Sequence, residues 1–185
     1  MVAGPTSIEP TSSRAADRLR LRPLRPDDEA AFVAAHRAMA LEAFPFGLFY
    51  DEGTPWLDYL HGLDAQRRDL DVPEGLVPAT FLLAEVDGEL VGRTSIRHRL
   101  NDHLAREGGH IGYGVLAAHR RCGYATEILR QSLVIARSVG VDRVLITCDD
   151  DNVGSAEVIE RCGGVFESLV TAADDGRPVR RYWVD

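Results

Sequence analysis

Hydrophobic and polar positions along the chain alternate between helical and strand spacing, which predicts a mixed α/β fold. The clearest helical face lies between Gly123 and Gly140. Gly140 follows the last residue of this face, where glycine typically ends a helix. The members of this face are Ala125, Ile128, Leu129, Ser132, Ala136 and Val139. Strand-like runs stand before and after it, over 110–115 and 143–148. Strand, helix and strand in this order predict a crossover unit of parallel type.

The first part of the chain predicts one strand and one helix. Residues 19–22 alternate as a strand, and the turn over 23–26 leads into a helix that starts at Asp27 and runs to about Met39. The segment 40–79 then concentrates aromatic side chains around prolines and glycines.

The middle of the chain predicts antiparallel strands. Residues 81–92 have the pattern of a β-hairpin, with Asp87-Gly88 at the turn, and the second strand extends through 90–96. Gly112 and Gly114 weaken 110–115 as a regular strand. They indicate a bulge, or a close approach by another chain or a ligand.

The turn before the clearest helix has the chemistry of an anion site. Gly123 lets a ligand approach the backbone, and the first N–H groups of a helix lack partners inside it. Arg120 and Arg121 add positive charge beside those amides. The pattern over 120–125 is Arg-x-x-Gly-x-Ala. Taken alone, such a pattern is equally typical of a glycine required only for backbone geometry.

A second motif follows the strand at 143–148. Asn152 or Ser155 can cap a short helix that ends at Gly163-Gly164. In this order, Arg120-x-x-Gly123-x-Ala125 and Asn152-x-x-Ser155 resemble two motifs of the GCN5-related N-acetyltransferase (GNAT) superfamily. That superfamily transfers an acyl group from acetyl-CoA, usually to an amine. The resemblance covers about 18–185 and is strongest over 81–166.

The resemblance implies an α/β fold with a mixed, mostly antiparallel central sheet flanked by helices. It also implies a cofactor cleft where the strands at 110–115 and 143–148, the fourth and fifth of such a sheet (β4/β5), splay apart. Acetyl-CoA is the expected co-substrate. The residues expected to bind it are Val115, Arg120, Arg121, Cys122, Gly123, Tyr124, Ala125, Thr126, Asn152 and Ser155. The segment 40–79 is expected to cover the acceptor site, with packing between helices as the alternative explanation for its aromatics.

Two residues are candidates for the base that takes a proton from the amine. His110 begins the central strand, near where several relatives place an acidic base, and histidine titrates near neutrality. Glu107 is the second candidate, and a structural strand-end role is the alternative for His110. Many relatives carry a tyrosine where this chain has Ile159. Tyr113 and Tyr124 are possible substitutes in protonating the departing thiolate, and water is the alternative.

The histidines do not indicate a metal site. His98, His103 and His110 lack a compact metal-ligand spacing, so we expect no metal. The segment from Arg97 to Asp102 gathers basic and amide groups near the expected cleft. Arginine can grip a carboxylate with two hydrogen bonds, so recognition of an acceptor carboxylate is one hypothesis. A solvated strand end is the other.

Composition narrows the class of protein. The 185 residues, 45% of them hydrophobic, suffice for one sizeable core, so we expect a disordered leader over 1–17 and one domain over 18–185. A net charge of -8 argues against a nucleic-acid scaffold. No apolar run is long enough to span a bilayer, so we expect no membrane partner and a cytoplasmic location. Three cysteines without paired spacing indicate reduced thiols.

These observations predict an acetyl-CoA-dependent N-acetyltransferase whose acceptor is a primary amine of a small molecule, amino acid or peptide. One alternative is an acyl-CoA-binding sensor without turnover, and another is a phosphoryl-transfer protein. The latter lacks the expected Gly-x-x-x-x-Gly-Lys-Ser/Thr motif. A β-rich last strand over 180–184, if it lies at a sheet edge, suggests a homodimer.

Overall fold

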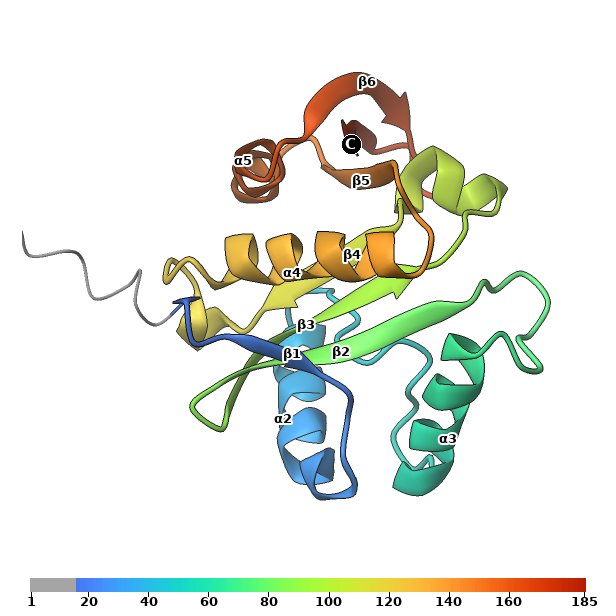
Figure 1. Cartoon of the computed structure of the whole chain (residues 1–185), viewed down its shortest axis with the longest axis vertical. Helices are drawn as coiled ribbons and strands as arrows, with labels where there is room; N and C mark the ends of the chain where they lie inside the picture. Colours follow the sequence, from blue (N-terminus) through green and yellow to red (C-terminus); the bar gives the residue numbers. More distant parts are fainter. Residues whose placement is uncertain (1–15) are drawn as a thin grey trace, which may run out of the picture.

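Two antiparallel sheets form the framework of the computed structural model, which describes residues 16–185 (Figure 1). The first sheet has the order β1-β2-β3-β4 and the second the order β5-β7-β6. The strands are β1 (Arg20–Arg22), β2 (Ala79–Val86), β3 (Glu89–Arg97), β4 (Ile111–Val115), β5 (Val144–Asp149), β6 (Val165–Thr171) and β7 (Pro178–Val184). The mixed α/β class and the mostly antiparallel sheet expected from the sequence are confirmed.

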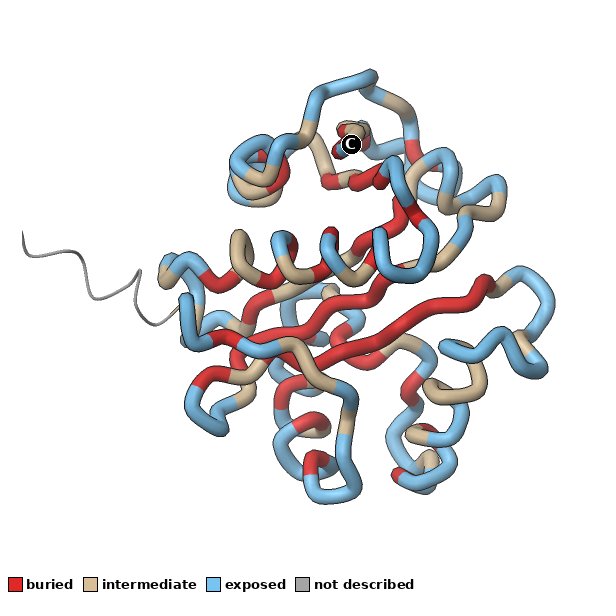
Figure 2. Tube along the Cα trace, in the orientation of Figure 1, coloured by how far each residue is buried: buried red, intermediate tan, exposed pale blue. Residues whose placement is uncertain are grey.

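Helices cover both faces of the first sheet (Figure 1). One face carries α2 and α3, and the other carries α4, which packs on β3 and β4. The fourth helix, α5, contacts α4 and β5. The helices are α2 (Glu29–Ala40), α3 (Trp56–Arg67), α4 (Tyr124–Ser138) and α5 (Val153–Arg161), with short turns η1 (Pro26–Asp28), η2 (Leu104–Gly108) and η3 (Ala117–His119). In Figure 2 the buried residues follow the strands of the first sheet and the inward sides of these helices.

Local sequence signals explain the two best-defined turns. Asp87 and Gly88 have φ of 51° and 86°, the left-handed conformations that a tight two-residue hairpin turn requires. The helix expected after Gly123 is α4, and Gly140 follows it with φ of 89°. The hydroxyl of Ser132, in the buried face of α4, donates to the hydroxyl of Thr94 at 3.0 Å and so brings no unpaired polar group into the core.

The aromatic residues of 40–79 mostly pack around a single side chain. Phe32 of α2 lies 5.7 Å from Phe46, 5.2 Å from Tyr50 and 5.1 Å from Trp56 between ring centroids. All four are buried. The cluster joins α2, α3 and the segment between them to the first sheet. Packing therefore explains most of these aromatics, while Phe49 stands apart with an exposed fraction of 65%.

The strands on either side of α4 do not form the expected parallel pair. β4 is hydrogen-bonded to β3 and β5 to β7, and no ladder joins β4 to β5. The sheets meet just before β4, where the amide of His110 donates to the carbonyl of Leu145 at 2.7 Å. The strands then diverge, which confirms the splayed cleft.

The last strand is not at an edge. β7 has β5 on one side and β6 on the other, so the edge position that the sequence suggested for 180–184 is wrong. The edge strand next to it is β6, whose Val165, Phe166 and Leu169 have exposed fractions of 69%, 54% and 53%. The pattern of β6 gave no alternation by which to recognise it, because both of its faces are largely open to solvent.

The expected leader over 1–17 falls almost entirely outside the described residues, which begin at Ala16. Within the described part of the chain, every helix is too short or too polar to cross a bilayer.

A buried ion pair fixes the start of the fold. Arg22 of β1 donates to both carboxylate oxygens of Asp28, at 2.6 and 2.7 Å, and to Glu85 of β2 at 2.6 Å. The amide of Arg25 also donates to Asp28 at 2.6 Å. The hydrogen bond from Arg22 is the main reason why the pKa of Asp28 lies below its ordinary value of 3.8, and it outweighs the opposing effect of burial.

We expect Asp28→Asn to lower the free energy of unfolding by about 1–3 kcal/mol at neutral pH, because a charge-assisted pair is replaced by weaker bonds. The folded-state pKa of Asp28 is depressed, so its contribution is present above 3.8 and is lost as pH falls through the folded pKa. Urea unfolding from neutral to acid pH measures this difference. A gap between wild type and variant that stays constant down to pH 2 would contradict it.

Candidate active site

The vertex of the cleft is held by two hydrogen bonds. His110 donates its amide to Leu145, and the amide of Leu145 donates to Nδ1 of the His110 ring at 2.9 Å. Gly109 has φ of 63°, and a Cβ there would lie 2.8 Å from the Leu145 carbonyl. Only glycine fits this approach. Beyond the vertex β4 pairs with β3 alone, so the backbone groups on its other side can bind an extended ligand, except for the Val115 carbonyl, which accepts from Arg120.

The turn at the start of α4 has the geometry of an anion-binding nest. Arg121 and Gly123 both have left-handed φ, 64° and 81°. Gly123 provides no side-chain cap, so the first helical N–H groups of α4 remain available. The residues Tyr124, Ala125 and Thr126 supply these groups. The turn fits a pyrophosphate by its backbone.

Arg120 is engaged elsewhere. Its Nε donates to the Val115 carbonyl at 3.1 Å, and its guanidinium forms an ion pair with Glu42, beyond the end of α2. Arg120 therefore ties the turn to β4 and to the segment that follows α2. Arg121 is exposed, and within the described residues no carboxylate pairs with it.

The other expected residues of the turn divide between packing and access. Tyr124 is 9% exposed and packs with Leu19 and Ile128, so it is a core aromatic. The carbonyl of Thr126 accepts a hydrogen bond from the Cys162 thiol at 3.6 Å, which links α4 to α5. Cys122 is half-buried, and its thiol donates to the Arg120 carbonyl at 3.5 Å.

The Asn152 motif builds the opposite wall of the cleft. The Asn152 side chain caps α5 by accepting from the amide of Ser155 at 3.0 Å. The Ser155 hydroxyl lies 3.0 Å from the hydroxyl of Tyr113, which reaches over from β4. This bond joins β4 of the first sheet to α5. Burial raises the pKa of Tyr113, and the bond to Ser155 opposes that effect.

Ile159 belongs to the core. It is fully buried, and a Cβ on Gly164 would lie 2.4 Å from its side chain. At the position where many relatives carry a tyrosine, Ile159 is therefore a packing residue of the core. Of the two possible substitutes, Tyr124 is buried away from the cleft and Tyr113 presents its hydroxyl between the walls.

Both candidate bases are held by backbone groups. The carboxylate of Glu107, whose side chain is 4% exposed, accepts from the amide of Ala173 at 3.1 Å. Its carbonyl accepts from the Thr147 hydroxyl at 2.8 Å. His110 is 8% exposed, and burial lowers its pKa. Because Nδ1 accepts from Leu145, the neutral ring carries its hydrogen on Nε2.

The glycines of β4 make room for two side chains. A Cβ on Gly112 would lie 3.1 Å from the Arg97 guanidinium, and one on Gly114 would lie 2.6 Å from the ring of Phe44. The pairing of β3 with β4 runs without a register shift. The close approach expected from these glycines therefore involves the protein's own side chains and needs no bulge.

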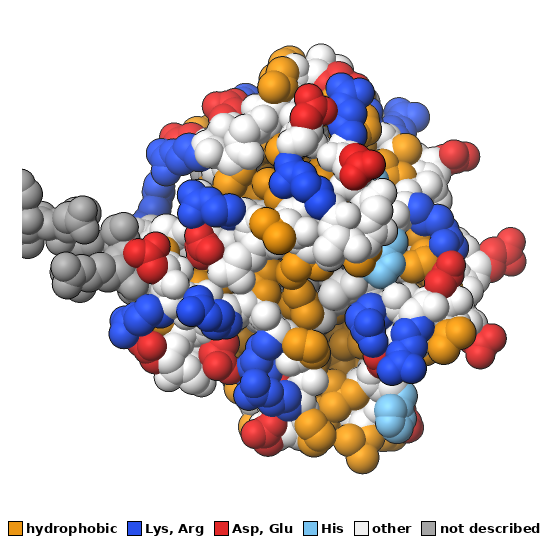
Figure 3. Space-filling model, in the orientation of Figure 1, with side chains coloured by type: hydrophobic (Ala, Val, Ile, Leu, Met, Phe, Trp, Pro, Cys, Tyr) orange, Lys and Arg blue, Asp and Glu red, His pale blue; other side chains and the backbone are white. Residues whose placement is uncertain are grey.

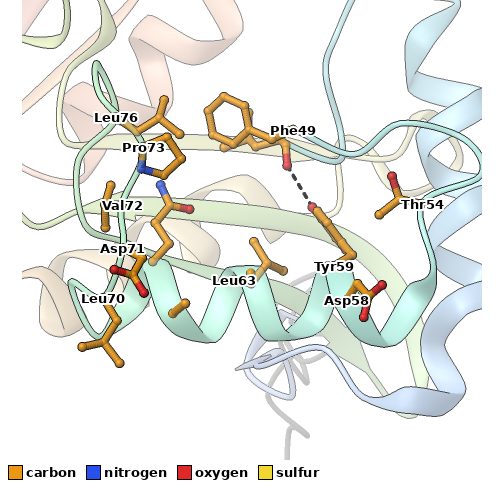
Figure 4. Close-up of a pocket in the computed structure, with 14 residues that line it drawn as sticks. Phe49, Thr54, Asp58, Tyr59, Leu63, Leu70, Asp71, Val72, Pro73 and Leu76 are labelled. Carbon is orange, nitrogen blue, oxygen red and sulfur yellow. Dashed lines mark hydrogen bonds between the residues drawn. The ribbon is translucent and has the colours of Figure 1, made fainter.

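A separate hollow of about 340 Å³ lies along α3 (Figure 4). Its lining is mainly apolar, with Asp58 and Asp71 among the polar residues, and the Tyr59 hydroxyl donates to the Leu48 carbonyl at 3.1 Å beside it. All lining residues lie within 48–76. The hollow is thus distinct from the cleft and belongs to the segment expected to cover the acceptor.

Charge is distributed rather than concentrated. On the face drawn in Figure 3, arginines and carboxylates are interspersed. The net charge of -8 is therefore not gathered into one field on that face, and it favours dispersal in water over steering of a ligand.

Comparison with known proteins bears on this site. A family model described as an acetyltransferase (GNAT) domain matches residues 18–165, which include the vertex, the anion nest and the Asn152 cap. The chain belongs to the GNAT acetyltransferase family. This confirms the resemblance read from the sequence, and acetyl-CoA is the co-substrate that the family implies. No curated protein matches the GNAT chain.

Solved structures share the GNAT fold at low identity. RimJ of Mycobacterium smegmatis, in complex with CoA-disulfide, is 23% identical with a TM-score of 0.67 over 90% of this chain and 81% of its own. RimL, a ribosomal alpha-N-protein acetyltransferase in complex with coenzyme A, is 18% identical with a TM-score of 0.68 over 92% and 95%. The microcin self-immunity acetyltransferase MccE, in complex with acetyl-CoA and AMP, is 17% identical with a TM-score of 0.65 over 91% and 92%.

We expect Gly123→Ala to weaken coenzyme A binding about tenfold, because a Cβ at this left-handed position both strains the nest and shields its amides. Gly140→Ala is a matched control, since its φ of 89° is close to the 81° of Gly123 and it lies at the other end of α4. Both variants should lose about 1–2 kcal/mol of stability. Calorimetry with coenzyme A measures the affinity, and equal losses in both variants would remove the turn from the binding site.

Proposed function

We propose that this GNAT protein is an acetyl-CoA-dependent N-acetyltransferase that acts on a primary amine. The observation that carries the proposal is that β4 and the turn before α4 both leave backbone groups without a partner in the described part of the fold. These groups lie on the unpaired side of β4 beyond the His110–Leu145 contact and in the nest at Arg121 and Gly123. An extended arm that ends in a pyrophosphate is complementary to both. Acetyl-CoA, the family's co-substrate, has this shape.

The residues assigned to coenzyme A have different roles. The amides of the turn bind phosphate oxygens, and Val115 and its neighbours on β4 pair with the pantetheine arm. Arg120 positions the turn through Val115 and Glu42. Asn152 holds α5 so that Ser155 faces Tyr113 across the cleft. Both arginines of the turn are exposed, but Arg120 is paired with Glu42, so Arg121 is the one proposed to meet phosphate.

The reaction that fits is direct attack of the amine on the thioester. A lysine-like ammonium has a pKa of about 10.4, so a proton must leave before attack. Free N–H groups on the open side of β4 can polarise the carbonyl as charge builds on its oxygen. A departing thiol with a pKa of about 8.5 needs little acid assistance. The Tyr113 hydroxyl, hydrogen-bonded to Ser155, is the acid we propose, with water as the alternative.

The acceptor is proposed as an amine of a small molecule, amino acid or peptide. The breadth of this proposal is supported by structures that share the fold. RimL is named as a ribosomal protein acetyltransferase, and MccE as a microcin self-immunity acetyltransferase. The hollow along α3 provides mainly apolar surface next to Phe49 and Tyr59. We also propose that the protein is cytoplasmic and forms a homodimer.

A second candidate function is an acyl-CoA sensor without turnover. The observation that favours it is the state of the expected catalytic groups, because Ile159 is core and His110 and Glu107 are both held by backbone amides. Binding without transfer is the outcome that separates it from the enzyme.

We expect calorimetry to show binding of acetyl-CoA, and free thiol to be released when primary amines are added to the same preparation. All 21 Lys and Arg residues of the chain are arginines, so it has no lysine of its own to be acetylated. Release without added amine is then attributable to hydrolysis or to the chain terminus, which intact-mass measurement resolves. Binding without amine-dependent release would move the assignment to the sensor, and no binding would reject both.

His110 gives a test of the proton acceptor. We expect His110→Asn to keep turnover within about threefold, because the Asn carbonyl oxygen can accept from Leu145 as Nδ1 does. His110→Ala leaves that buried amide unpaired, and should lower both coenzyme A affinity and turnover. Steady-state kinetics and calorimetry on the two variants measure this. A loss of about a hundredfold in turnover for His110→Asn, with affinity intact, would instead establish His110 as the base.

A further inference from the structure

Two arginines lie on the face of β3 that is turned away from α4. Arg93 and Arg97 are four residues apart on one strand, so their side chains share a face, while Thr94 on the other face contacts Ser132 of α4. Both guanidiniums lie next to β4. Arg93 donates to the carbonyl of Gly112 at 3.0 Å, and Arg97 fills the space where Gly112 lacks a Cβ.

Neither arginine has a carboxylate partner in the described part of the chain. Arg93 is 3% exposed, and it is satisfied only in part by the carbonyls of Gly112 and Pro45 and by the ring of Phe44, 4.4 Å from its central carbon. Its Nε is buried without any hydrogen-bond partner. Arg97 is half-buried, and donates to the Gly108 carbonyl at 3.3 Å. Burial lowers the pKa of both, that of Arg93 to about 9.

This arrangement is unlike that of the other buried or half-buried arginines. Arg22 binds Asp28 and Glu85, Arg180 binds Asp150, and Arg181 binds Glu167. Each of these three arginines thus has a carboxylate partner, which Arg93 and Arg97 lack among the described residues. Two neighbouring positive charges away from water, without an anion, are costly unless a ligand supplies one.

The position of the pair relates it to the acceptor. The face that carries Arg93 and Arg97 is covered by the segment after α2, where Phe44 lies against Gly114 of β4. The anion nest lies at the start of α4, which covers the opposite face. A ligand on the arginine face therefore meets β4 from the side that the coenzyme's phosphates do not occupy.

We propose that Arg97, backed by the charge of Arg93, binds a carboxylate of the amine acceptor on this face of β4. The inference rests on the proposed N-acetyltransferase function and narrows its acceptors to amino acids and other amines that carry a carboxylate. Arg97 makes the contact because it is the accessible member of the pair. Arg93 is a positioning residue that also holds Pro45, and with it the segment over the acceptor side.

Arg99 is the matched control within the same strand end. It is exposed and makes a two-pronged ion pair with Asp69, at 2.8 and 3.2 Å. Of the two arginines in 97–102, Arg97 is thus the one available for recognition, because Arg99 is paired with Asp69 at the surface.

The test uses a series of amino acids in which the amine stands progressively further from the carboxylate, each with its primary amide. Thiol release gives kcat/KM for each acid and amide with wild type, Arg97→Gln, Arg97→Lys and Arg99→Gln. Comparing variants on the same acceptor cancels differences in amine basicity. Calorimetry with coenzyme A shows whether each variant keeps its cofactor site.

We expect wild type to prefer acids over amides, and Arg97→Gln to lower kcat/KM for acids about tenfold or more while leaving amides unchanged. Arg97→Lys, a point charge without the planar fork, should keep part of the preference, and Arg99→Gln all of it.

Wild-type release confined to acceptors without a carboxylate, or equal losses for acids and amides in Arg97→Gln, would overturn the inference and leave the transferase standing. If Arg97→Gln loses coenzyme A affinity, the result for Arg97→Lys is used instead. An Arg97→Lys variant that has normal coenzyme A affinity but no preference for acids over amides would also overturn the inference. Absence of release with every amine would reject the proposed function itself.

Discussion

The site depends on one short contact between two sheets. At His110 and Leu145 the sheets share one backbone hydrogen bond and one bond from the Leu145 amide to the His110 ring, and no ladder joins β4 to β5. Because each sheet is completed by its own antiparallel partners, β4 can leave one side unpaired without losing its place. Unpaired backbone groups destabilise a fold when they are buried away from water. Those of β4 face the cleft, where a ligand can bind them. Gly109 is the sequence requirement for this contact, since a side chain would meet the Leu145 carbonyl.

What the sequence predicted well was local. The turn at Asp87 and Gly88, the ends of α4 and the cap at Asn152 each depend on a few neighbouring residues whose backbone preferences are strong. The central place of β7 and the edge place of β6 depend on pairing between distant segments, which periodicity does not encode. Likewise, no sequence pattern predicted that Tyr113 of β4 would contact Ser155 of α5, or that Arg120 would pair with Glu42.

Arginines that looked equivalent in the sequence have different roles in the structure. At the turn, Arg120 and Arg121 looked alike beside the expected phosphate site, yet Arg120 binds Val115 and Glu42, whereas Arg121 has no carboxylate partner among the described residues. At the end of β3, Arg97 and Arg99 looked alike as well, yet one is half-buried without an anion and the other is paired at the surface. Strand alternation does not explain the second pair, because Arg99 lies beyond the end of β3. The surroundings that decide each role come from segments far away in sequence.

The two sides of β4 therefore carry different kinds of information. The side proposed for the coenzyme is built mainly from backbone amides and glycines, which many sequences can supply, and structures with 17% to 23% identity keep the fold over 90% to 92% of the chain. The side proposed for the acceptor is built from side chains, namely the aromatic cluster around Phe32, the ring of Phe44 and the arginines of β3. Recognition by side chains changes with each substitution, whereas recognition by backbone does not. Family membership thus identifies the acyl donor, and the acceptor has to be read from the charges and contours that are particular to this chain.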